Sequence, residues 1–314
     1  MRRRWRSAVL GGILLLAGAC AGGGSGEPPP AAPAVAPQAL AIEERTEAFV
    51  DPSRTTEAHS TVAGSDSRAL TTRIFAPAAG QPGRPYPLVV FAHGSGGLGT
   101  RYDRLLQTWA EAGYVVAAPA FPIARDDTAP GEWQNDLPKL PGDMSFVIDQ
   151  MLRLNAEPGS PLQGAVNPAK VGVAGHSMGG MTVLGVAGNT CCHDRRIKAA
   201  VVLAGRETPF GSGQFWNRII TPILLVHGDA DYSVVYGDGR RAYANAPPPR
   251  FLLTIFGGDH GAPFSGDRAH PQAGVVTDAT LHFLGHFLND DAGALARLAA
   301  RADAPGVAKL DLER

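Results

Sequence analysis

The sequence predicts an α/β fold, with a mostly parallel, twisted sheet of about eight strands, helices on both faces and an antiparallel hairpin at the N-terminal end. Three observations lead to this prediction. Short aliphatic and β-branched runs recur along the 314 residues, they alternate with segments of helical character, and several of the runs are apolar without interruption. Continuous apolar strands suit a sheet that is covered on both faces, and the alternation implies parallel strands joined by crossover helices.

The expected elements follow one another in a regular order. The hairpin pairs residues 56–62 with 70–76 around the turn Gly64-Ser65-Asp66-Ser67. Further strands are expected at 87–92, 114–118, 170–174, 199–203, 222–226 and 251–256. Helices are expected at 102–112, 143–154, 178–187, 236–244 and 275–288. Together these elements make a single domain of roughly 250 residues.

Composition excludes several classes of protein. The 28 Lys and Arg residues nearly balance 29 Asp and Glu, for a net charge of −1, so no basic surface for nucleic acid is expected. Three cysteines are too few for a disulfide scaffold, and 44% hydrophobic residues exclude disorder of the whole chain. Without the four arginines of the first 19 residues, 24 basic residues remain against 29 acidic ones and the net charge becomes −5. The composition therefore describes an acidic domain behind a basic leader.

Three terminal segments flank the expected domain, which we place at residues 43–290. Four arginines precede an apolar run at 8–19 that is too short to span a membrane, so residues 1–19 are predicted to be a secretory signal. Residues 20–42 are rich in Gly, Pro and Ala and have too few large apolar side chains to offset the entropy of ordering, which predicts a tether. Residues 291–314 contain helix-forming stretches without catalytic-looking side chains, and we expect a C-terminal appendage.

Cys20 determines how the leader is removed. It follows Ala17-Gly18-Ala19, and the segment resembles a bacterial lipoprotein signal, in which the cysteine becomes the lipidated first residue. That pattern prefers Leu where this chain has Ala17. The alternative is ordinary signal-peptidase cleavage near Ala19 or Ala21. We therefore expect an exported protein, anchored to a membrane or cell surface through Cys20 or otherwise secreted.

A candidate nucleophile follows the strand at 170–174. The sequence Gly175-His176-Ser177-Met178-Gly179-Gly180 leads from that strand into a helix. A G-x-S-x-G pattern in the order strand, sharp turn, helix is typical of a nucleophile elbow. Glycines two places to either side let the chain turn tightly and hold Ser177 in a strained conformation above the sheet edge. The alternative is a Gly-rich turn without catalytic role.

Two later strands end in loops that carry the groups a serine nucleophile needs. The strand at 222–226 runs into His227-Gly228-Asp229-Ala230-Asp231, and the strand at 251–256 runs into Gly257-Gly258-Asp259-His260-Gly261. A serine hydroxyl is a poor nucleophile until a base takes its proton, and the base needs an oriented partner. The chain therefore offers serine, aspartate and histidine in that order.

With these motifs the chain resembles the α/β-hydrolase superfamily. Within it, the chain is similar to the dienelactone hydrolase-related and platelet-activating-factor acetylhydrolase-like secreted esterases, a neighbourhood that also contains bacterial polyester hydrolases. The resemblance covers roughly residues 70–288. It implies that Ser177 is the nucleophile, Asp231 the acid and His260 the general base.

The resemblance also decides between competing residues. The family pattern H-G-x-x-D favours Asp231 over Asp229, which we expect to shape the turn. Among the other histidines, His270, His282 and His286 do not follow the last strand directly. His176 lies inside the elbow, and we interpret it as a packing residue that points into the structure.

Ester hydrolysis also needs donors for the oxyanion. They are expected at the backbone N–H of Met178, the residue after the nucleophile, and in the loop after the third strand. That loop is His93-Gly94-Ser95-Gly96-Gly97, and the family pattern points to Ser95. The alternative is a flexible Gly-rich turn. No Walker-type or dinucleotide-binding motif accompanies these glycines, which argues against a phosphate site.

Phe210, Trp216 and Trp133 are the candidate substrate-binding residues. Phe210 and Trp216 lie between the strands ending at Leu203 and Val226, on the side of the sheet where substrates bind in open α/β folds. Trp133 belongs to the Pro-rich segment 125–142, which we expect to run over the active-site face. Each of these side chains could equally belong to the core.

No metal and no cofactor are expected. His282 and His286 have a spacing that can place two ligands on one metal, but the glutamate of a zinc-protease motif is missing and the neighbouring residues indicate a core-facing helix. The resemblance implies hydrolysis without a metal. Cys191 and Cys192 could form a vicinal disulfide in an oxidising compartment, and we interpret them as two small buried thiols.

The function expected from the resemblance is that of a secreted serine hydrolase, which cleaves small or polymeric carboxylic esters through an acyl-enzyme intermediate. Two alternatives stay open. An acyltransferase or amidase would use the same triad, because the difference lies in the pocket and in water access. A non-enzymatic surface-binding lipoprotein could use a hydrolase scaffold. We expect a monomer that meets no nucleic acid and contacts membrane only through its N-terminal anchor.

Overall fold

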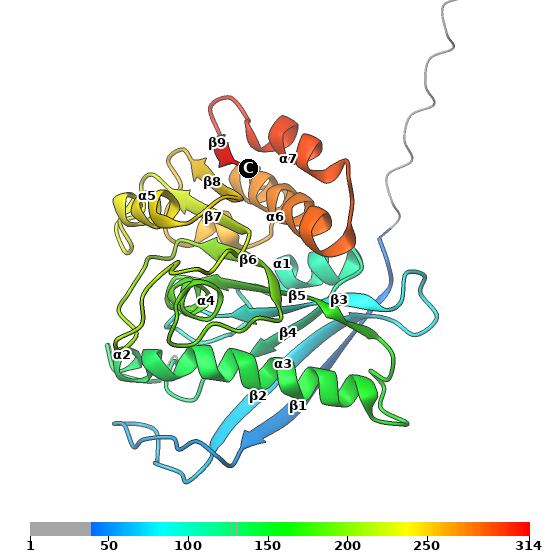
Figure 1. The fold of residues 1–314 in the computed structure, drawn as a ribbon, viewed down its shortest axis with the longest axis vertical. Helices are drawn as coiled ribbons and strands as arrows, with labels where there is room; N and C mark the ends of the chain where they lie inside the picture. Colours follow the sequence, from blue (N-terminus) through cyan, green and yellow to red (C-terminus); the bar gives the residue numbers. More distant parts are fainter. Residues whose placement is uncertain (1–38, 126, 130) are drawn as a thin grey trace, which may run out of the picture. The chain divides into compact units, whose positions relative to one another are not determined.

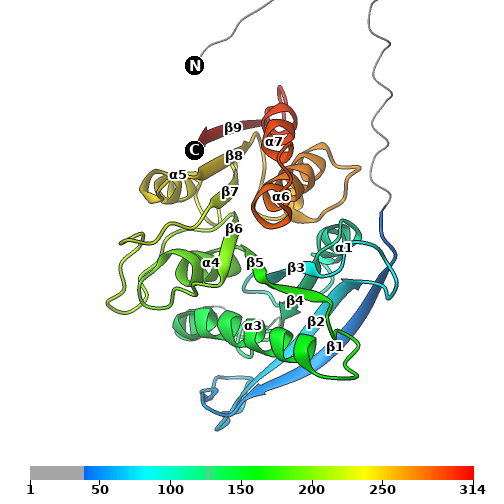
Figure 2. The ribbon, with the colours of Figure 1, turned by 45° about the vertical axis from the view of Figure 1, so that its right-hand side comes forward.

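The computed structural model describes residues 39–125, 127–129 and 131–314. The predicted signal, most of the predicted tether and the candidate lipidation site Cys20 lie outside these residues. The described strands form one nine-stranded sheet in the order β1-β2-β4-β3-β5-β6-β7-β8-β9 (Figures 1 and 2). Among the described residues, no helix combines the length and the apolar character needed to span a membrane.

Strands and helices alternate along the chain as predicted. The strands are β1 (Ile42–Asp51), β2 (Arg68–Pro77), β3 (Tyr86–Ala92), β4 (Val115–Pro119), β5 (Val166–His176), β6 (Ile197–Leu203), β7 (Ile223–Gly228), β8 (Arg250–Ile255) and β9 (Ala308–Glu313). The helices are α1 (Asp103–Glu111), α2 (Trp133–Asp136), α3 (Leu140–Ala156), α4 (Met178–Gly188), α5 (Tyr236–Asn245), α6 (Pro271–Asn289) and α7 (Ala294–Ala302), with the 3₁₀ helices η1 (Leu137–Lys139) and η2 (Ala262–Phe264).

The centre of the sheet is parallel and its edges are antiparallel. Strands β4, β3, β5, β6, β7 and β8 pair in parallel, whereas β1 with β2, β2 with β4 and β8 with β9 pair antiparallel. This confirms the predicted mostly parallel sheet. Because the central strands run the same way, the loops after β3, β5, β7 and β8 all leave from the same edge of the sheet.

The N-terminal hairpin is confirmed, but its first strand is not the one expected. The hairpin pairs β1 with β2, from Ile42 opposite Pro77 to Asp51 opposite Arg68. The segment 56–62 forms only isolated bridges, between Thr56 and Ser65 and between His59 and Val62. Strand β1 lies at the edge of the sheet and is mostly polar from Glu43 to Glu47, so it lacks the continuous apolar run that marks a buried strand.

Two hydrophobic cores lie on the two faces of the sheet. In β3, Leu88 and Val90 belong to a core shared with helices α3, α4 and α5, while Val89 and Phe91 belong to a core shared with α1, α6 and α7. The helices on either side of the sheet are visible in Figures 1 and 2. Alternate side chains of a strand point to opposite faces, so a continuously apolar strand is buried on both sides.

The C-terminal residues 291–314, which we expected to be an appendage, contribute to the sheet. Helix α7 buries Leu298 and Ala302 in the second core. Strand β9 then pairs antiparallel with β8, from Ala308 opposite Ile255 to Glu313 opposite Arg250. Charged residues alternate with apolar ones along this strand, and the sequence therefore shows no continuous apolar run there.

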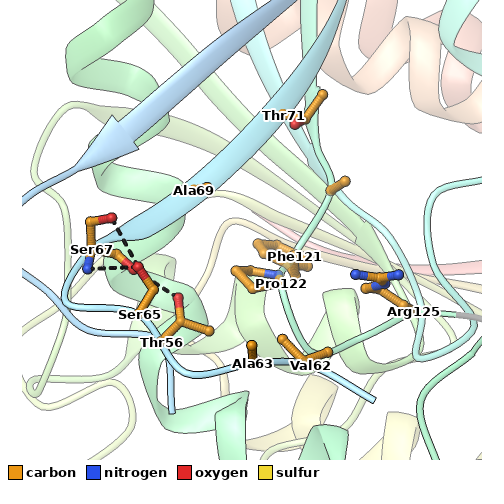
Figure 3. A pocket seen from close by; sticks show the side chains of 11 residues that line it. Thr56, Val62, Ala63, Ser65, Ser67, Ala69, Thr71, Phe121, Pro122 and Arg125 are labelled. Carbon is orange, nitrogen blue, oxygen red and sulfur yellow. Dashed lines mark hydrogen bonds between the residues drawn. The ribbon is translucent and has the colours of Figure 1, made fainter. Parts of the chain in front are cut away.

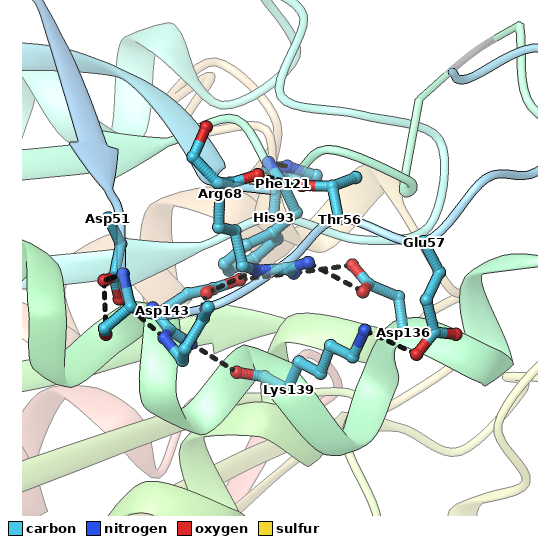
Figure 4. A network of polar contacts seen from close by, with 12 residues as sticks. Asp51, Thr56, Glu57, Arg68, His93, Phe121, Asp136, Lys139 and Asp143 are labelled. Carbon is cyan, nitrogen blue, oxygen red and sulfur yellow. Dashed lines mark hydrogen bonds and ion pairs between the residues drawn. The ribbon is translucent and has the colours of Figure 1, made fainter. Parts of the chain in front are cut away.

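A buried ionic network joins the hairpin to the start of α3 (Figure 4). The side chain of Arg68 is fully buried, and its guanidinium donates to both oxygens of Asp136 and both oxygens of Asp143 at 2.6–2.9 Å. Arg54 connects Asp143 to Asp51. Burial alone would lower the pKa of Arg68, but its bonds to the two carboxylates raise that pKa above its ordinary value. The network therefore ties α2 and α3 to β2 through paired charges.

Candidate active site

Ser177 occupies the sharp turn between β5 and α4. Strand β5 ends at His176, helix α4 begins at Met178, and Ser177 between them has φ 57° and ψ −118°. Such a conformation is costly for a residue with a Cβ and persists only when the surrounding structure holds it. Here the N–H of Ser177 donates to the carbonyl of Leu203 in β6 at 2.9 Å. The chain thus holds one side chain away from the sheet at the N-terminus of a helix.

The glycines around Ser177 are required by close packing. A Cβ at Gly179 would overlap the carbonyl oxygen of Ala92 at the end of β3, and a Cβ at Gly175 would overlap the carbonyl of Gly179. A Cβ at Gly180 would lie 2.9 Å from the Cα of Gly205. Real Cβ atoms do not approach so closely. The G-x-S-x-G pattern therefore lets α4 begin directly against β3 and β6.

His260 connects Ser177 to Asp231. Its Nε2 lies 2.8 Å from the Oγ of Ser177, and its Nδ1 lies 2.7 Å from Oδ2 of Asp231. A carboxylate only accepts hydrogen bonds, so Nδ1 carries the proton and the neutral ring presents Nε2 as an acceptor to the serine hydroxyl. The three residues follow β5, β7 and β8, whose carboxyl ends lie at one edge of the sheet.

Asp231 is buried and held by its own turn. Its relative exposure is 4%, and its Oδ1 accepts the backbone N–H groups of Ser233 and Val234 at 2.8 and 2.9 Å. Oδ2 is left to face His260. Asp229 has another place: it is exposed, and its Oδ1 accepts the N–H of Gly257 at 2.6 Å. Asp229 therefore joins the two loops, and Asp231 contacts the histidine.

The other candidate histidines lie elsewhere. His270 precedes α6, and His282 and His286 lie on α6, packed over the second core. The Nε2 of His282 and the Nδ1 of His286 have no hydrogen-bond partner. Within the described residues, however, no group of three or more His, Cys, Asp or Glu side chains is placed to hold a metal ion. The two histidines therefore have no third ligand among these residues.

The 93–97 loop lies beside Ser177. A Cβ at Gly94 would lie 3.5 Å from the Cβ of Ser177. Ser95 is therefore the residue directly after a glycine whose backbone approaches the serine. Both backbone groups of Gly94 are bonded: its N–H donates to the hydroxyl of Tyr102 at 3.2 Å, and its carbonyl accepts from Nδ1 of His93 at 2.7 Å. Met178 is fully buried as the first residue of α4. Met178 thus adjoins the serine along the chain, and Ser95 follows the glycine that approaches it.

A cavity of about 280 Å³ opens next to Ser95. Trp133, Arg125 and Thr128 line it together with Ser95, so part of the segment 125–142 lies beside the 93–97 loop. A second cavity of about 430 Å³ shares Arg125 with the first (Figure 3). Its wall comes from the 56–67 loop, the start of β2 and the residues after β4, and Figure 3 shows Phe121 and Pro122 among the side chains that line it.

Phe210 and Trp216 are not brought to Ser177. Phe210 is 2% exposed and belongs to the first core, where it contacts Gly185. Trp216 lies against Gly188, and its indole N–H donates to Glu207 at 2.8 Å. Both contacts are in the C-terminal half of α4, whereas Ser177 precedes the N-terminus of that helix. Of the three aromatic candidates, the structure brings only Trp133 to the cavity beside Ser95.

Cys191 and Cys192 form a disulfide, so our interpretation of them as two buried thiols was wrong. Cys191 is also exposed rather than buried. The turn that carries them docks on the 210–216 loop: the N–H of Thr190 donates to the carbonyl of Gln214, and the N–H of Gln214 donates to the hydroxyl of Thr190, both at 2.9 Å. Burial would favour two neutral thiols, but this pair lies in a surface turn.

The sequence did not reveal the role of Tyr102, nor the full surroundings of His176. His176 is buried as expected, with 4% exposure, but both of its ring nitrogens are hydrogen-bonded. Nδ1 lies 2.8 Å from the hydroxyl of Tyr102, and Nε2 lies 2.6 Å from the carbonyl oxygen of His260. The sequence signal that could have pointed to these bonds was the polar side chain of His176 directly before the nucleophile, at the end of an apolar strand.

Comparisons with known proteins indicate which family the chain belongs to. The family model described as PET hydrolase-like matches residues 111–295, more than half of the chain. The model described as platelet-activating factor acetylhydrolase, isoform II, matches residues 59–134. An uncharacterized protein YfhR of Salmonella typhi is 30% identical over 146 residues, which are 38% of this chain and 48% of that protein. The YfhR protein of Salmonella typhimurium strain LT2 gives the same values. The match spans about half the length of these curated relatives.

Proposed function

The chain belongs to the PET hydrolase-like family, and from this premise we propose that it is an exported serine hydrolase that cleaves carboxylic esters through an acyl-enzyme intermediate. The observation that carries the proposal is the hydrogen-bonded chain from Ser177 through His260 to Asp231. In it, a strained serine at a helix N-terminus faces a histidine whose tautomer is fixed by a buried carboxylate. These are the parts that nucleophilic catalysis by serine requires.

Acylation proceeds in two stages. The Oγ of Ser177 attacks the ester carbonyl carbon while its proton passes to Nε2 of His260, and Asp231 stabilises the imidazolium that results. The carbonyl oxygen becomes an oxyanion. When the tetrahedral intermediate collapses, the ester C–O bond breaks and His260 returns the proton to the leaving alcohol. The acyl group remains on Ser177.

Deacylation repeats the sequence with water. His260 takes a proton from a water molecule, which attacks the acyl carbon and forms a second tetrahedral intermediate. Its collapse breaks the bond to Ser177, and the proton from His260 restores the serine hydroxyl. The products are the carboxylic acid and the free enzyme.

The oxyanion is held by backbone N–H groups of Ser95 and Met178. One preorganised donor of this kind is worth about 3–4 kcal/mol of transition-state stabilisation. The proposal is supported by the position of Met178 as first residue of α4, where the free N–H groups of the helix favour negative charge. It is also supported by the approach of Gly94 to Ser177, which brings the next residue, Ser95, to the other side.

We place one part of the substrate in the cavity beside Ser95, against Trp133. A panel of p-nitrophenyl esters of graded acyl length, together with an aromatic polyester, identifies the substrate class. Acyltransferase or amidase activity with the same triad is distinguished by product analysis in the presence of alcohol acceptors. A non-enzymatic lipoprotein would turn over none of these compounds.

Export is part of the proposal and is supported by the chain's leader and by the Cys191–Cys192 disulfide, because disulfides persist mainly in oxidising compartments. Palmitate labelling of wild type and Cys20→Ala in a bacterial host tests the lipid anchor. Label on wild type but not on the variant supports attachment through Cys20. Equal absence of label favours plain cleavage.

The catalytic proposal is tested by Ser177→Ala. The variant is expected to lose hydrolysis of p-nitrophenyl butyrate to background, with an unchanged circular dichroism spectrum. Retained turnover by a folded variant contradicts the proposal.

A further inference from the structure

His176 is a buried, titratable side chain that the proposed mechanism does not use. It adjoins the nucleophile in sequence, and its ring lies 4.8 Å from the ring of His260 and 5.0 Å from the ring of Phe264, measured between centroids. Both of its nitrogens are bonded to groups from other segments, Tyr102 and His260. An apolar side chain could fill this space without either bond, so the two bonds are what the imidazole adds.

The direction of each hydrogen bond is fixed by chemistry. The carbonyl oxygen of His260 can only accept, so the proton of His176 lies on Nε2, and Nδ1 is then an acceptor. Tyr102 must donate its hydroxyl proton to that Nδ1, and its oxygen accepts the N–H of Gly94. Each hydrogen bond in this chain therefore points the same way: Gly94 donates to Tyr102, Tyr102 donates to His176, and His176 donates to the carbonyl of His260.

The protonation states agree with this direction. Burial lowers the pKa of His176 to about 3, so the ring is neutral wherever His260 can act as a base. Burial also raises the pKa of Tyr102, which keeps its proton. A cationic His176 would repel the imidazolium that forms on His260 during catalysis, and burial removes that conflict.

The two ends of this chain are the two parts of the site that must be held relative to Ser177. Gly94 precedes Ser95, one proposed oxyanion donor, and the bonded carbonyl belongs to the backbone of the base, His260. Displacement of a catalytic group by about 1 Å can cost about 100-fold in rate. Neither the 93–97 loop nor the loop after β8 belongs to a helix or strand at these positions, so hydrogen bonds to other segments fix them in place of a regular backbone ladder.

We propose that Tyr102 and His176 are positioning residues that hold the 93–97 loop and His260 at a fixed separation across Ser177. This inference rests on the proposed function, in which His260 is the base and Ser95 an oxyanion donor. Tyr102 and His176 do not touch the reacting atoms. They act through the backbone of Gly94 and of His260.

Two substitutions at position 176 separate the two bonds of the ring. In His176→Asn the side-chain oxygen replaces Nδ1 and still accepts from Tyr102, but the donor to His260 is lost. In His176→Gln the side-chain N–H group replaces Nε2 and keeps that donor. Tyr102→Phe removes only one oxygen atom, and it takes away the hydrogen-bond partner of the Gly94 N–H and of Nδ1 of His176. Tyr114→Phe is the matched control, because Tyr114 is also buried, and its hydroxyl bonds to Asn289 instead.

The experiment measures kcat and KM for p-nitrophenyl butyrate, the melting temperature, and the low-field proton NMR resonance of the hydrogen bond between His260 and Asp231. We expect kcat to fall about 10- to 100-fold in His176→Asn and Tyr102→Phe, with KM within about 3-fold of wild type. His176→Gln should recover kcat to within about 5-fold, and Tyr114→Phe should keep it. The resonance should broaden in the two impaired variants, because His260 is less fixed and its proton exchanges faster.

The outcomes separate the two proposals. Wild-type kcat and an unchanged resonance in both His176→Asn and Tyr102→Phe overturn the positioning role. Equal losses in Tyr114→Phe would show a general effect of removing a buried hydroxyl and would overturn it as well. If wild type itself hydrolyses no ester, the proposed function fails, and the resonance alone then decides whether His176 fixes His260. If His176→Asn does not fold, Tyr102→Phe carries the same test.

Discussion

Nε2 of His260 lies 2.8 Å from Oγ of Ser177, although 83 positions separate the two residues in the sequence. The parallel sheet makes this contact, because β5 and β8 both end at the edge where the two residues leave their strands. Asp231 reaches the same edge from β7, between them in the sheet. The predictions below follow from what holds these three side chains together.

Asp231→Asn should lower kcat about 10³- to 10⁴-fold with a folded protein. The amide would present an N–H group to Nδ1 of His260 and favour the tautomer in which Nε2 cannot accept the serine proton. The matched control is Asp229→Asn, two residues away. The side chain of Asp229 is exposed, and it accepts a hydrogen bond from the N–H of Gly257 and not from His260. Steady-state kinetics on p-nitrophenyl butyrate compare the two. Equal effects of both substitutions would contradict the assignment of Asp231.

Gly179→Ala should destabilise the fold by about 3 kcal/mol or more, because the new methyl group would overlap the carbonyl of Ala92 and neither backbone can yield cheaply. Gly237→Ala is the control. It lies in α5 with no atom near the added Cβ, and a helical alanine should leave stability within about 1 kcal/mol of wild type, on the more stable side. Urea unfolding measures both. A fully stable Gly179→Ala would show that the elbow is less tightly packed than described.

Arg68→Met should cost about 3–5 kcal/mol of stability, since it leaves Asp136 buried without its guanidinium partner and leaves Asp143 with Arg54 alone. Arg153→Met provides the comparison, because Arg153 pairs with Glu157 on an exposed helix surface. Its effect should stay within about 0.5 kcal/mol. Chemical denaturation gives both values. Similar small losses for both variants would mean that the network in Figure 4 contributes little.

The neutral state of His176 predicts how stability depends on pH. Its pKa falls from an ordinary 6.5 to about 3, mainly through burial, with a further lowering by the charges of His260 and Arg101; the hydrogen bond to the His260 carbonyl and the charge of Asp231 raise this pKa but do not offset the burial. The unfolded chain therefore binds a proton that the folded chain does not, between these two values. Stability from this group is complete above pH 6.5 and is lost as pH falls toward 3.

The size of that loss can be isolated by a variant. Between pH 7.5 and 5.5 the neutral His176 should account for about 1.4 kcal/mol of lost unfolding free energy. Urea titrations at both pH values, on wild type and His176→Gln, give the difference, because the other titrating groups are common to both proteins. An identical pH dependence in the two proteins would contradict the buried, neutral state of His176.

The central strands and the positions of Ser177, Asp231 and His260 could be predicted because their sequence signals are local. Strands buried on both faces are continuously apolar, and the glycines of the elbow and the residues after β7 and β8 stand at strand ends. The edge strands β1 and β9 were missed because polar and charged residues interrupt them, so no continuous apolar run marks them. Edge strands form through pairing with a neighbour, which a single sequence does not display.

The surroundings of the site were harder to predict for the same reason. The bonds of Tyr102 and His176 join residues 74 positions apart, and nothing in the local sequence of Tyr102 indicates its partner. Phe210 and Trp216 lie in the expected stretch between β6 and β7, but that stretch turns back along α4 toward Gly185 and Gly188. The path of a loop determines which of its side chains meet a substrate, and composition does not specify that path.

The most direct measurement is covalent labelling with a fluorophosphonate, followed by peptide mass spectrometry. The probe phosphonylates a serine only when a base removes its proton and donors stabilise the developing oxyanion. The account predicts one label per chain, located on Ser177, with labelling lost in Ser177→Ala and strongly slowed in Asp231→Asn. A folded wild-type protein that takes no label, or takes it on another serine, would contradict the assignment of Ser177 as the nucleophile.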